Sequence, residues 1–175
     1  MNLVYSWERS IYEMKLMHDT LSVEIEMEVR KEYKKISKHK RVLMPVLDYR
    51  VDLYVNGHKF DEDEVFVEKV FFQSLLSPGK YPMFTCTCGI FGCGGYYVDV
   101  FHEDDAVIWL TEQSPFMDKS LPSSKRFVFS RNNIIEFAEQ LVEKLEEVRH
   151  ISESHELNFQ YDRGKYLDTI RNFAT

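Results

Sequence analysis

The strictest pattern in this sequence is an alternation of apolar and polar side chains over residues 21–29. Leucine, valine, isoleucine or methionine stands at every odd position, and serine or glutamate occupies every even position. Successive side chains of a β-strand point to opposite faces of its sheet. The segment is therefore predicted to be a strand with one buried face.

Other strands are predicted on both sides of this segment. Residues 12–16 alternate in the same way, and His18-Asp19-Thr20 would turn them back as a hairpin. A short helix over residues 7–17 is an alternative. Downstream, residues 42–55 are strand-like and end at Asn56-Gly57, the strongest short signal for a hairpin turn.

Three helices are predicted in the remainder. Asp61 is expected to cap an apolar helix, with Glu64 three residues on, and Ser77-Pro78-Gly79 ends it. The clearest helix spans residues 133–150, where the apolar side chains form one stripe. A last helix is predicted around residues 166–173.

The middle of the chain predicts a meander of short antiparallel strands. Their predicted ranges are 82–88, 96–102, 106–112 and 126–129, and a further short alternation covers residues 157–161. Strands and helices are segregated along the chain, without the βαβ rhythm of a doubly wound fold. We therefore predict one α+β domain over residues 1–175, in which a mainly antiparallel sheet packs against two or three helices.

Length and composition agree with one folded domain. The chain has 175 residues, 44% of them hydrophobic. It begins without the basic and apolar segments of a secretory signal, and no run of 18 apolar residues predicts a membrane span. Three cysteines within eight residues are a poor disulfide framework for a secreted domain. We expect a cytoplasmic protein whose cysteines are reduced or bound to metal.

Charge is segregated along the chain. Residues 30–41 hold seven basic residues and one acid, a net +6, so a total of −7 leaves −13 elsewhere. The simplest interpretation is a solvated connector, and the alternative is a patch that binds phosphate or acids. One short basic stretch in an acidic protein argues against a nucleic-acid partner.

The most distinctive segment runs from Cys86 to Gly95 and holds four of the seven glycines. This density predicts a tight turn in which Gly94 or Gly95 has a positive φ or stands where a side chain would clash. The segment resembles the CxCG…GCxG element of a group of uncharacterised bacterial proteins, where it joins two strands after a phenylalanine-rich helix. A looser resemblance covers the Asn-Gly hairpin, the helix at Phe71-Phe72 and the strand bearing Trp109. That group has no assigned activity, so the resemblance implies no catalytic residue.

Three interpretations of the cysteines compete. In the first they are buried, reduced thiols that fill space beneath the turn, and no cofactor is bound. In the second, Cys86, Cys88 and Cys93 bind zinc with His102 or His58 as the fourth ligand, although their spacing departs from Cys-x₂₋₄-Cys.

The cysteine set also resembles the opening of a SWIM-type zinc finger, except that Gly95 stands at the histidine position. In the third interpretation a cysteine is the nucleophile of a thiol enzyme, with His102 reaching it across a hairpin. The sequence favours the first interpretation.

The long helix carries the candidate partner-binding residues, Glu139, Glu143 and Glu147, which repeat every four residues despite mutual repulsion. A solvated outer face is the simplest explanation, and a docking surface for a basic protein is the alternative. The leading functional hypothesis is a small, non-enzymatic, immunity-like protein that presents this acidic surface to a basic partner such as a nuclease toxin.

Overall fold

The computed structural model describes residues 18–60, 64–86, 95–112 and 124–175. Within these ranges the elements are, in chain order, β1 (Leu21–Ser37), β2 (Lys40–Val55), β3 (His58–Lys59), β4 (Glu64–Phe66), α2 (Glu68–Leu76), β5 (Gly79–Cys86), β6 (Tyr96–His102), β7 (Ala106–Glu112), β8 (Ser124–Ser130), α3 (Arg131–Ser154) and α4 (Arg163–Ala174). The strand predicted over residues 12–16, and its helical alternative, lie outside the described residues.

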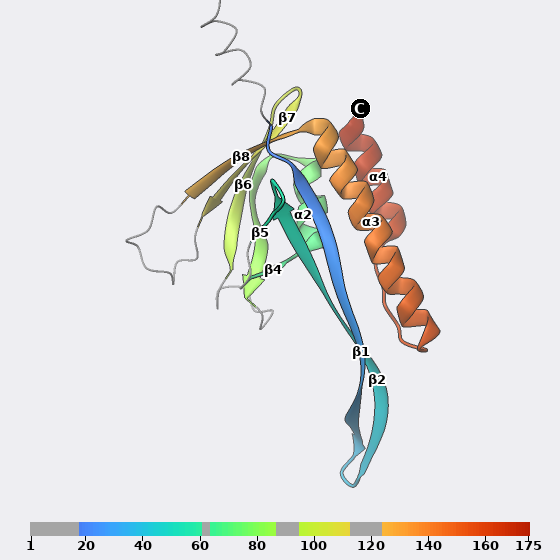
Figure 1. Ribbon diagram of the computed structural model, residues 1–175. Coiled ribbons are helices and arrows are strands. Elements are labelled where there is room, and N and C mark those ends of the chain that lie inside the picture. Colours follow the sequence, from blue (N-terminus) through green and yellow to red (C-terminus); the bar gives the residue numbers. More distant parts are fainter. Residues whose placement is uncertain (1–17, 61–63, 87–94, 113–123) are drawn as a thin grey trace, which may run out of the picture.

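The described strands form two antiparallel sheets (Figure 1). β1, β2 and β3 make a three-stranded sheet in that order, and β4 to β8 make a five-stranded meander in sequence order. An isolated parallel bridge pairs Asp19, just before β1, with Phe129 of β8. α3 packs on β1 and on α4, and α4 packs on α2. The predicted α+β class is confirmed, with mainly antiparallel sheets packed against helices.

The turn between β2 and β3 is the one that the sequence predicts. Asn56 has a φ of 53° and Gly57 a φ of 77°, and two consecutive positive φ values are what a type I′ hairpin turn requires. Val55 therefore pairs directly with His58. The Asn-Gly signal fixes both the existence and the register of this hairpin.

Polar side chains fasten the base of the β1–β2 hairpin to the rest of the molecule. The Asn56 amide donates to Asp19 (2.8 Å), whose carboxylate also accepts from the backbone N–H of Val128 (2.8 Å). The Asn133 side chain accepts from the backbone N–H of Leu21 (2.8 Å) and donates to its carbonyl (3.2 Å). These bonds tie the hairpin to β8 and α3.

The first described helix begins later than predicted. α2 begins at Glu68 because residues 64–66 pair with β5 as strand β4. Val67 stands at the N-cap and makes no side-chain cap bond. The prediction that the helix runs from Asp61 is therefore wrong, and Asp61 itself lies outside the described residues. Pairing with the distant strand β5 thus overrides the local signal for a helix cap.

The later elements follow the prediction closely. β6 and β7 have the predicted bounds, and α3 extends the predicted helix at both ends. The Ser130 hydroxyl accepts from the backbone N–H of Asn133 (3.1 Å) and caps α3. Residues 157–161 do not form the strand that their alternation suggests, yet Phe159 and Tyr161 pack against the core.

One core cluster lies between the sheets and the helices. Phe137 of α3 is fully buried and its ring lies 5.0 Å from that of Phe71. Phe71 also contacts Trp109 of β7 edge-on, and Trp109 contacts Phe129 of β8 in the same way. Edge-to-face aromatic pairs of this kind add to the burial free energy. None of the helices in the described ranges combines the length and apolar composition needed to cross a lipid bilayer.

Candidate functional site

The cysteine and glycine turn enters from β5 and leaves into β6. Gly95 has a φ of +81°, and a Cβ added there would lie 2.1 Å from the carbonyl oxygen of Phe84. This confirms the prediction that Gly94 or Gly95 occupies a position closed to other residues. Cys88, Cys93 and Gly94 lie outside the described residues.

Cys86 ends β5 and forms a disulfide bond. The prediction that all three cysteines are reduced is therefore wrong. An odd number of cysteines argues against a framework in which every cysteine is paired, but it does not argue against a single bond. A disulfide sulfur carries no thiolate, so in this state Cys86 offers neither a zinc ligand nor a nucleophile.

His102 lies far from Cys86. It ends β6, and the β5–β6 register places Cys86 beyond the opposite end of that strand, past the Phe84–Tyr96 pair. The His102 Nε2 lies 2.9 Å from the carbonyl oxygen of Ser74, and burial lowers its pKa. Cys86 and His102 are therefore not brought together, and the other predicted partners of His102, Cys88 and Cys93, lie outside the described residues.

The acidic residues of α3 are only partly a free surface. Glu139, Glu143 and Glu147 are all exposed, and Glu147 pairs with Lys144 (3.1 Å). Glu146, one turn along, is held by Arg149 and by the hydroxyl of Tyr161. Hydrogen bonds from these two groups lower the pKa of Glu146 to about 2. Among the described residues, the carboxylates of this face that make no ion pair are those of Glu136, Glu139 and Glu143.

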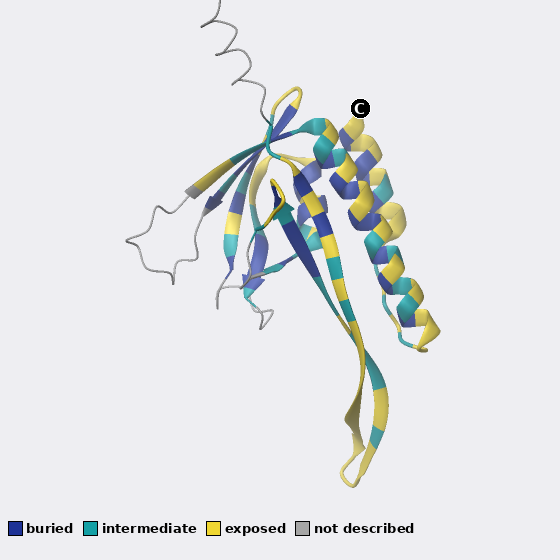
Figure 2. Ribbon diagram, viewed as in Figure 1, coloured by how far each residue is buried: buried dark blue, intermediate teal, exposed yellow. Residues whose placement is uncertain are grey.

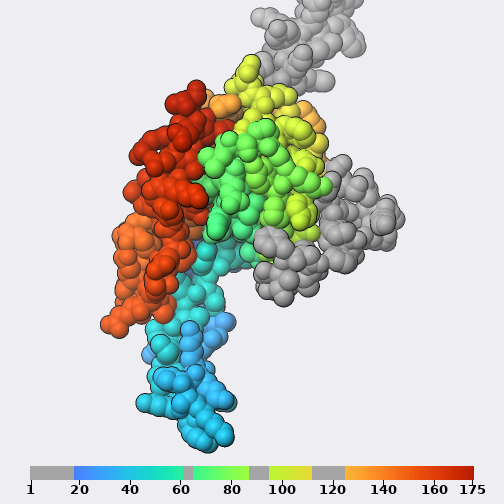
Figure 3. All heavy atoms as spheres, turned by 180° about the vertical axis from the view of Figure 1, so that it is seen from behind, coloured from blue at the N-terminus to red at the C-terminus, as the bar shows by residue number. Residues whose placement is uncertain are grey.

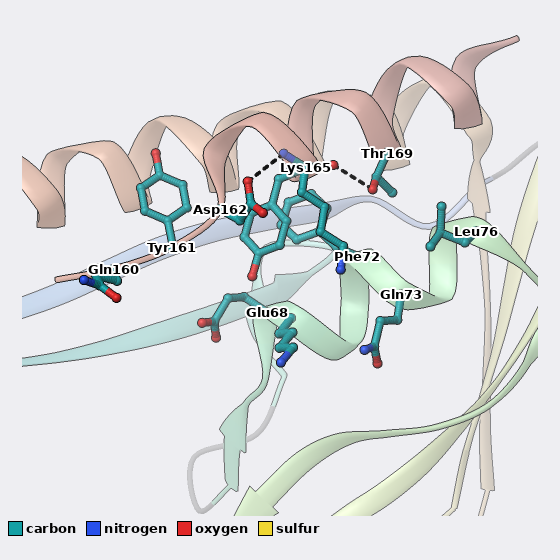
Figure 4. Close-up of a pocket in the computed structure, with 11 residues that line it drawn as sticks. Glu68, Phe72, Gln73, Leu76, Gln160, Tyr161, Asp162, Lys165 and Thr169 are labelled. Atoms are coloured by element: carbon teal, nitrogen blue, oxygen red, sulfur yellow. Dashed lines mark hydrogen bonds between the residues drawn. The ribbon is translucent and has the colours of Figure 1, made fainter.

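A cavity of about 360 Å³ lies between α2, α4 and the segment before α4 (Figure 4). Phe72 and Tyr166 line it and stack directly on each other, with ring centroids 3.9 Å apart. Burial raises the pKa of Glu68, and burial together with the nearby Glu68 charge raises the pKa of Tyr166 to about 12.

The cavity holds no paired nucleophile and base among its described lining residues. Thr169 is the one serine or threonine among these lining residues, and its hydroxyl donates to the backbone carbonyl of Lys165 (2.8 Å). The Asp162 carboxylate is engaged as the cap of α4, accepting from the Lys165 N–H (3.0 Å). Both polar groups are hydrogen-bonded to the backbone of α4.

The most exposed feature of the molecule is the distal part of the β1–β2 hairpin. We call residues 29–47 the arm: the ends of β1 and β2 and the turn between them. Every residue from 29 to 41 is exposed (Figure 2). In the space-filling view from behind, the arm extends well past the body of the molecule (Figure 3).

The arm exposes large apolar side chains. Tyr33 is 71% exposed, Ile36 60% and Leu43 46%. Tyr33 lies directly opposite Leu43 in the strand register. These two continue the face that carries the buried residues of β1 and β2 nearer the body, because strand side chains alternate with period two. An apolar face thus runs past the region that the body covers.

The arm also carries the basic stretch. Residues 30–41 are exposed, as predicted, but they are not a connector, since they form paired strands around a tight turn at Lys38 and His39. Arg30 pairs with Glu32 (2.9 Å) and Asp48 (2.9 Å). The other lysines and arginine of the arm make no ion pair within the described part of the chain.

Sequence reasoning missed the arm as a candidate site, although a signal was present. The strands predicted on either side of residues 30–41 are long and adjacent in sequence, which favours one hairpin continued through the basic stretch.

Comparison of the chain with protein-family models, curated protein sequences and solved structures gives no match.

Proposed function

We propose that this protein is a non-enzymatic, protein-binding protein and that the arm is its principal contact surface. The observation that carries the proposal is the exposure of Tyr33, Ile36 and Leu43 on a hairpin that the body leaves uncovered. Apolar side chains gathered on an exposed element are typical of interaction sites. They gain burial free energy only when another surface covers them.

The chemistry of the arm defines the partner surface that fits it. Lysine and arginine side chains flank the apolar ones, so a matching surface presents carboxylates around an apolar strip. Both edges of a two-stranded ribbon can also pair with an added strand, where backbone hydrogen bonds supply affinity.

A protein partner fits better than a nucleic acid. Glu24, Glu26 and Glu28 lie on β1 directly below the basic residues and are exposed. A duplex that contacts the basic tip and continues along the hairpin would bring phosphates against these carboxylates, and the rest of the chain carries −13. A short basic tip next to acids suits a contact of limited size.

The outer face of α3 is a second candidate surface. Glu139 and Glu143 are exposed on the side opposite the buried stripe, and they make no ion pair within the described residues. Carboxylates that repel one another at i,i+4 spacing gain from a nearby cation. A basic protein, such as a nuclease toxin bound by an immunity-like protein, is the class of partner that this face suits.

Site-specific photo-crosslinking tests the role of the arm. A benzoylphenylalanine residue replaces Tyr33 on the arm or, as matched control, Tyr97 on β6, which is also exposed at 46%. We expect protein adducts from position 33 and few from position 97, and Lys34→Glu with Lys35→Glu should remove them. Equal yields at both positions, or adducts that nuclease treatment abolishes, would contradict a protein-binding arm.

A further inference from the structure

We infer that the arms of two copies of this chain pair edge to edge, antiparallel, through β1. This inference rests on the proposed contact role of the arm and names the partner. It starts from the open edge of β1, since β2 occupies one edge and no strand in the described residues pairs with the other. Every residue of β1 from 29 to 37 is exposed, although Lys34 also lines a hollow with Ser152 and Leu157.

The charged side chains of β1 are complementary to those of a second β1 that runs in the opposite direction. On the outer face, where the even-numbered side chains point, the order from base to tip is Glu28, Arg30, Glu32 and Lys34. An antiparallel copy centred on Lys31 places Glu28 opposite Lys34 of the second copy. It also places Arg30 opposite Glu32 of the second copy. Two-fold symmetry repeats both pairs, so four cross-strand pairs of opposite charge form at once.

The inner face of the same register is largely apolar. Val29 lies opposite Tyr33 of the second copy, and both are exposed in the single chain, at 37% and 71%. The two copies of Lys31 meet at the axis, which opposes pairing. One like-charge pair stands against four pairs of opposite charge and two apolar pairs. Arg30 already pairs with Glu32 and Asp48 within each chain, so the two Glu28–Lys34 pairs and the two apolar pairs are what dimerisation adds, and the register as a whole is attractive.

Charge order also selects the direction of pairing. Lysines on an edge strand commonly prevent association, because neighbouring copies repel. A parallel copy in register would set Glu28 against Glu28 and Lys34 against Lys34, and would keep that repulsion. The antiparallel copy converts the same residues into attractive pairs. The alternation of charge along one strand therefore fits a second copy of that strand.

Two charge-inverted variants test this pairing. Glu28→Lys with Glu32→Lys makes the outer face uniformly positive over residues 28–34. Arg30→Glu with Lys34→Glu makes it uniformly negative. All four residues are exposed, so both variants should fold normally, as circular dichroism and thermal melting will check. Sedimentation velocity then compares the wild-type chain, each variant alone and an equimolar mixture.

We expect the wild-type chain to dimerise, each variant alone to sediment as a 20.9 kDa monomer, and the mixture to recover a heterodimer. A wild-type monomer at every concentration, or a dimer that both inversions leave intact, would overturn the inference. The crosslink at position 33 separates this failure from failure of the proposed function. A self-adduct supports pairing, whereas an adduct to a different protein keeps the arm as a contact surface and rejects the second copy as its partner.

Discussion

The two halves of the β1–β2 hairpin have the same secondary structure and opposite surroundings. Near the body, Leu21 and Val23 pair with Val55 and Leu53, and all four are buried. Farther out, Tyr33 pairs with Leu43 in the same continuous register, and both are exposed. The alternation of side chains predicts the strand, and only the elements that pack against it decide whether its apolar face is covered.

The apolar face of the hairpin is covered only as far as α3 and the five-stranded sheet extend. α3 packs along the near half of β1, and the bonds from Asp19, Asn56 and Asn133 fix that half to the body. The arm lies beyond them (Figure 1). Burial free energy therefore accumulates in the near half, whereas the exposed side chains of the arm gain little of it within a single chain.

The largest expected effect contrasts an aromatic ring in the core with one on the arm. Phe137→Ala removes a fully buried ring that contacts Phe71, so the free energy of unfolding should fall by about 3–5 kcal/mol. Tyr33→Ala removes a 71% exposed ring and should change it by no more than about 0.5 kcal/mol. Denaturant unfolding of both variants measures the difference. A costly Tyr33→Ala would show that the arm belongs to the folding core.

A smaller effect is expected at the glycine turn. Gly95→Ala forces a Cβ into the Phe84 carbonyl and keeps a positive φ, so it should cost on the order of 1–3 kcal/mol. Gly164→Ala, in α4 where an added Cβ meets only ordinary contacts, is the matched control. It should be neutral or stabilising by up to about 1 kcal/mol. Equal melting temperatures for the two variants would contradict the close approach at Gly95.

The pH dependence of stability should distinguish two glutamates of α3. The Arg149 and Tyr161 hydrogen bonds hold the pKa of Glu146 at about 2, below its ordinary value of 4.5. Its stabilising effect is therefore present above pH 4.5 and is lost as the pH falls toward 2. Glu146→Gln should flatten the stability profile over that range. Glu143→Gln, which removes an exposed carboxylate without an ion pair in the described residues, is the matched control because it leaves the Arg149 and Tyr161 hydrogen bonds to Glu146 in place.

The smallest effect concerns the acidic face of α3. Glu139→Gln with Glu143→Gln removes an i,i+4 repulsion, so the fold should gain a few tenths of a kcal/mol. If this face binds a basic partner, the double variant should associate more slowly and with a weaker salt dependence. Stopped-flow association with a captured partner, across ionic strength, measures both. Rates indifferent to charge and salt would assign binding to another surface.

Local signals in the sequence predicted much of the fold. The Asn56-Gly57 turn needs no tertiary information, because only residues that accept positive φ fit it. α3 follows from its own apolar stripe. Confinement was predicted for Gly94 or Gly95, because glycines cluster where backbones approach closely, and Gly95 is confined.

The remainder depends on contacts between distant parts of the chain. The start of α2 was missed because β4 pairs with β5. The distance between Cys86 and His102 follows from the β5–β6 register, which the sequence does not give. The paired strands of the arm were missed, although residues 30–41 were expected to be solvated, because charged residues appear in solvated connectors and in solvated strands alike.

Shortening the arm tests most directly the claim that it serves binding and not folding. Residues 30–46 are replaced by Asn-Gly, so that Val29 and Leu47 are joined as Val55 and His58 are joined by the chain's own turn. The free energy of unfolding is then measured at a dilution where the full-length chain is monomeric. We predict a change in this free energy of no more than about 1 kcal/mol. A loss of several kcal/mol would show that the arm supports the fold and would contradict its assignment as a contact surface.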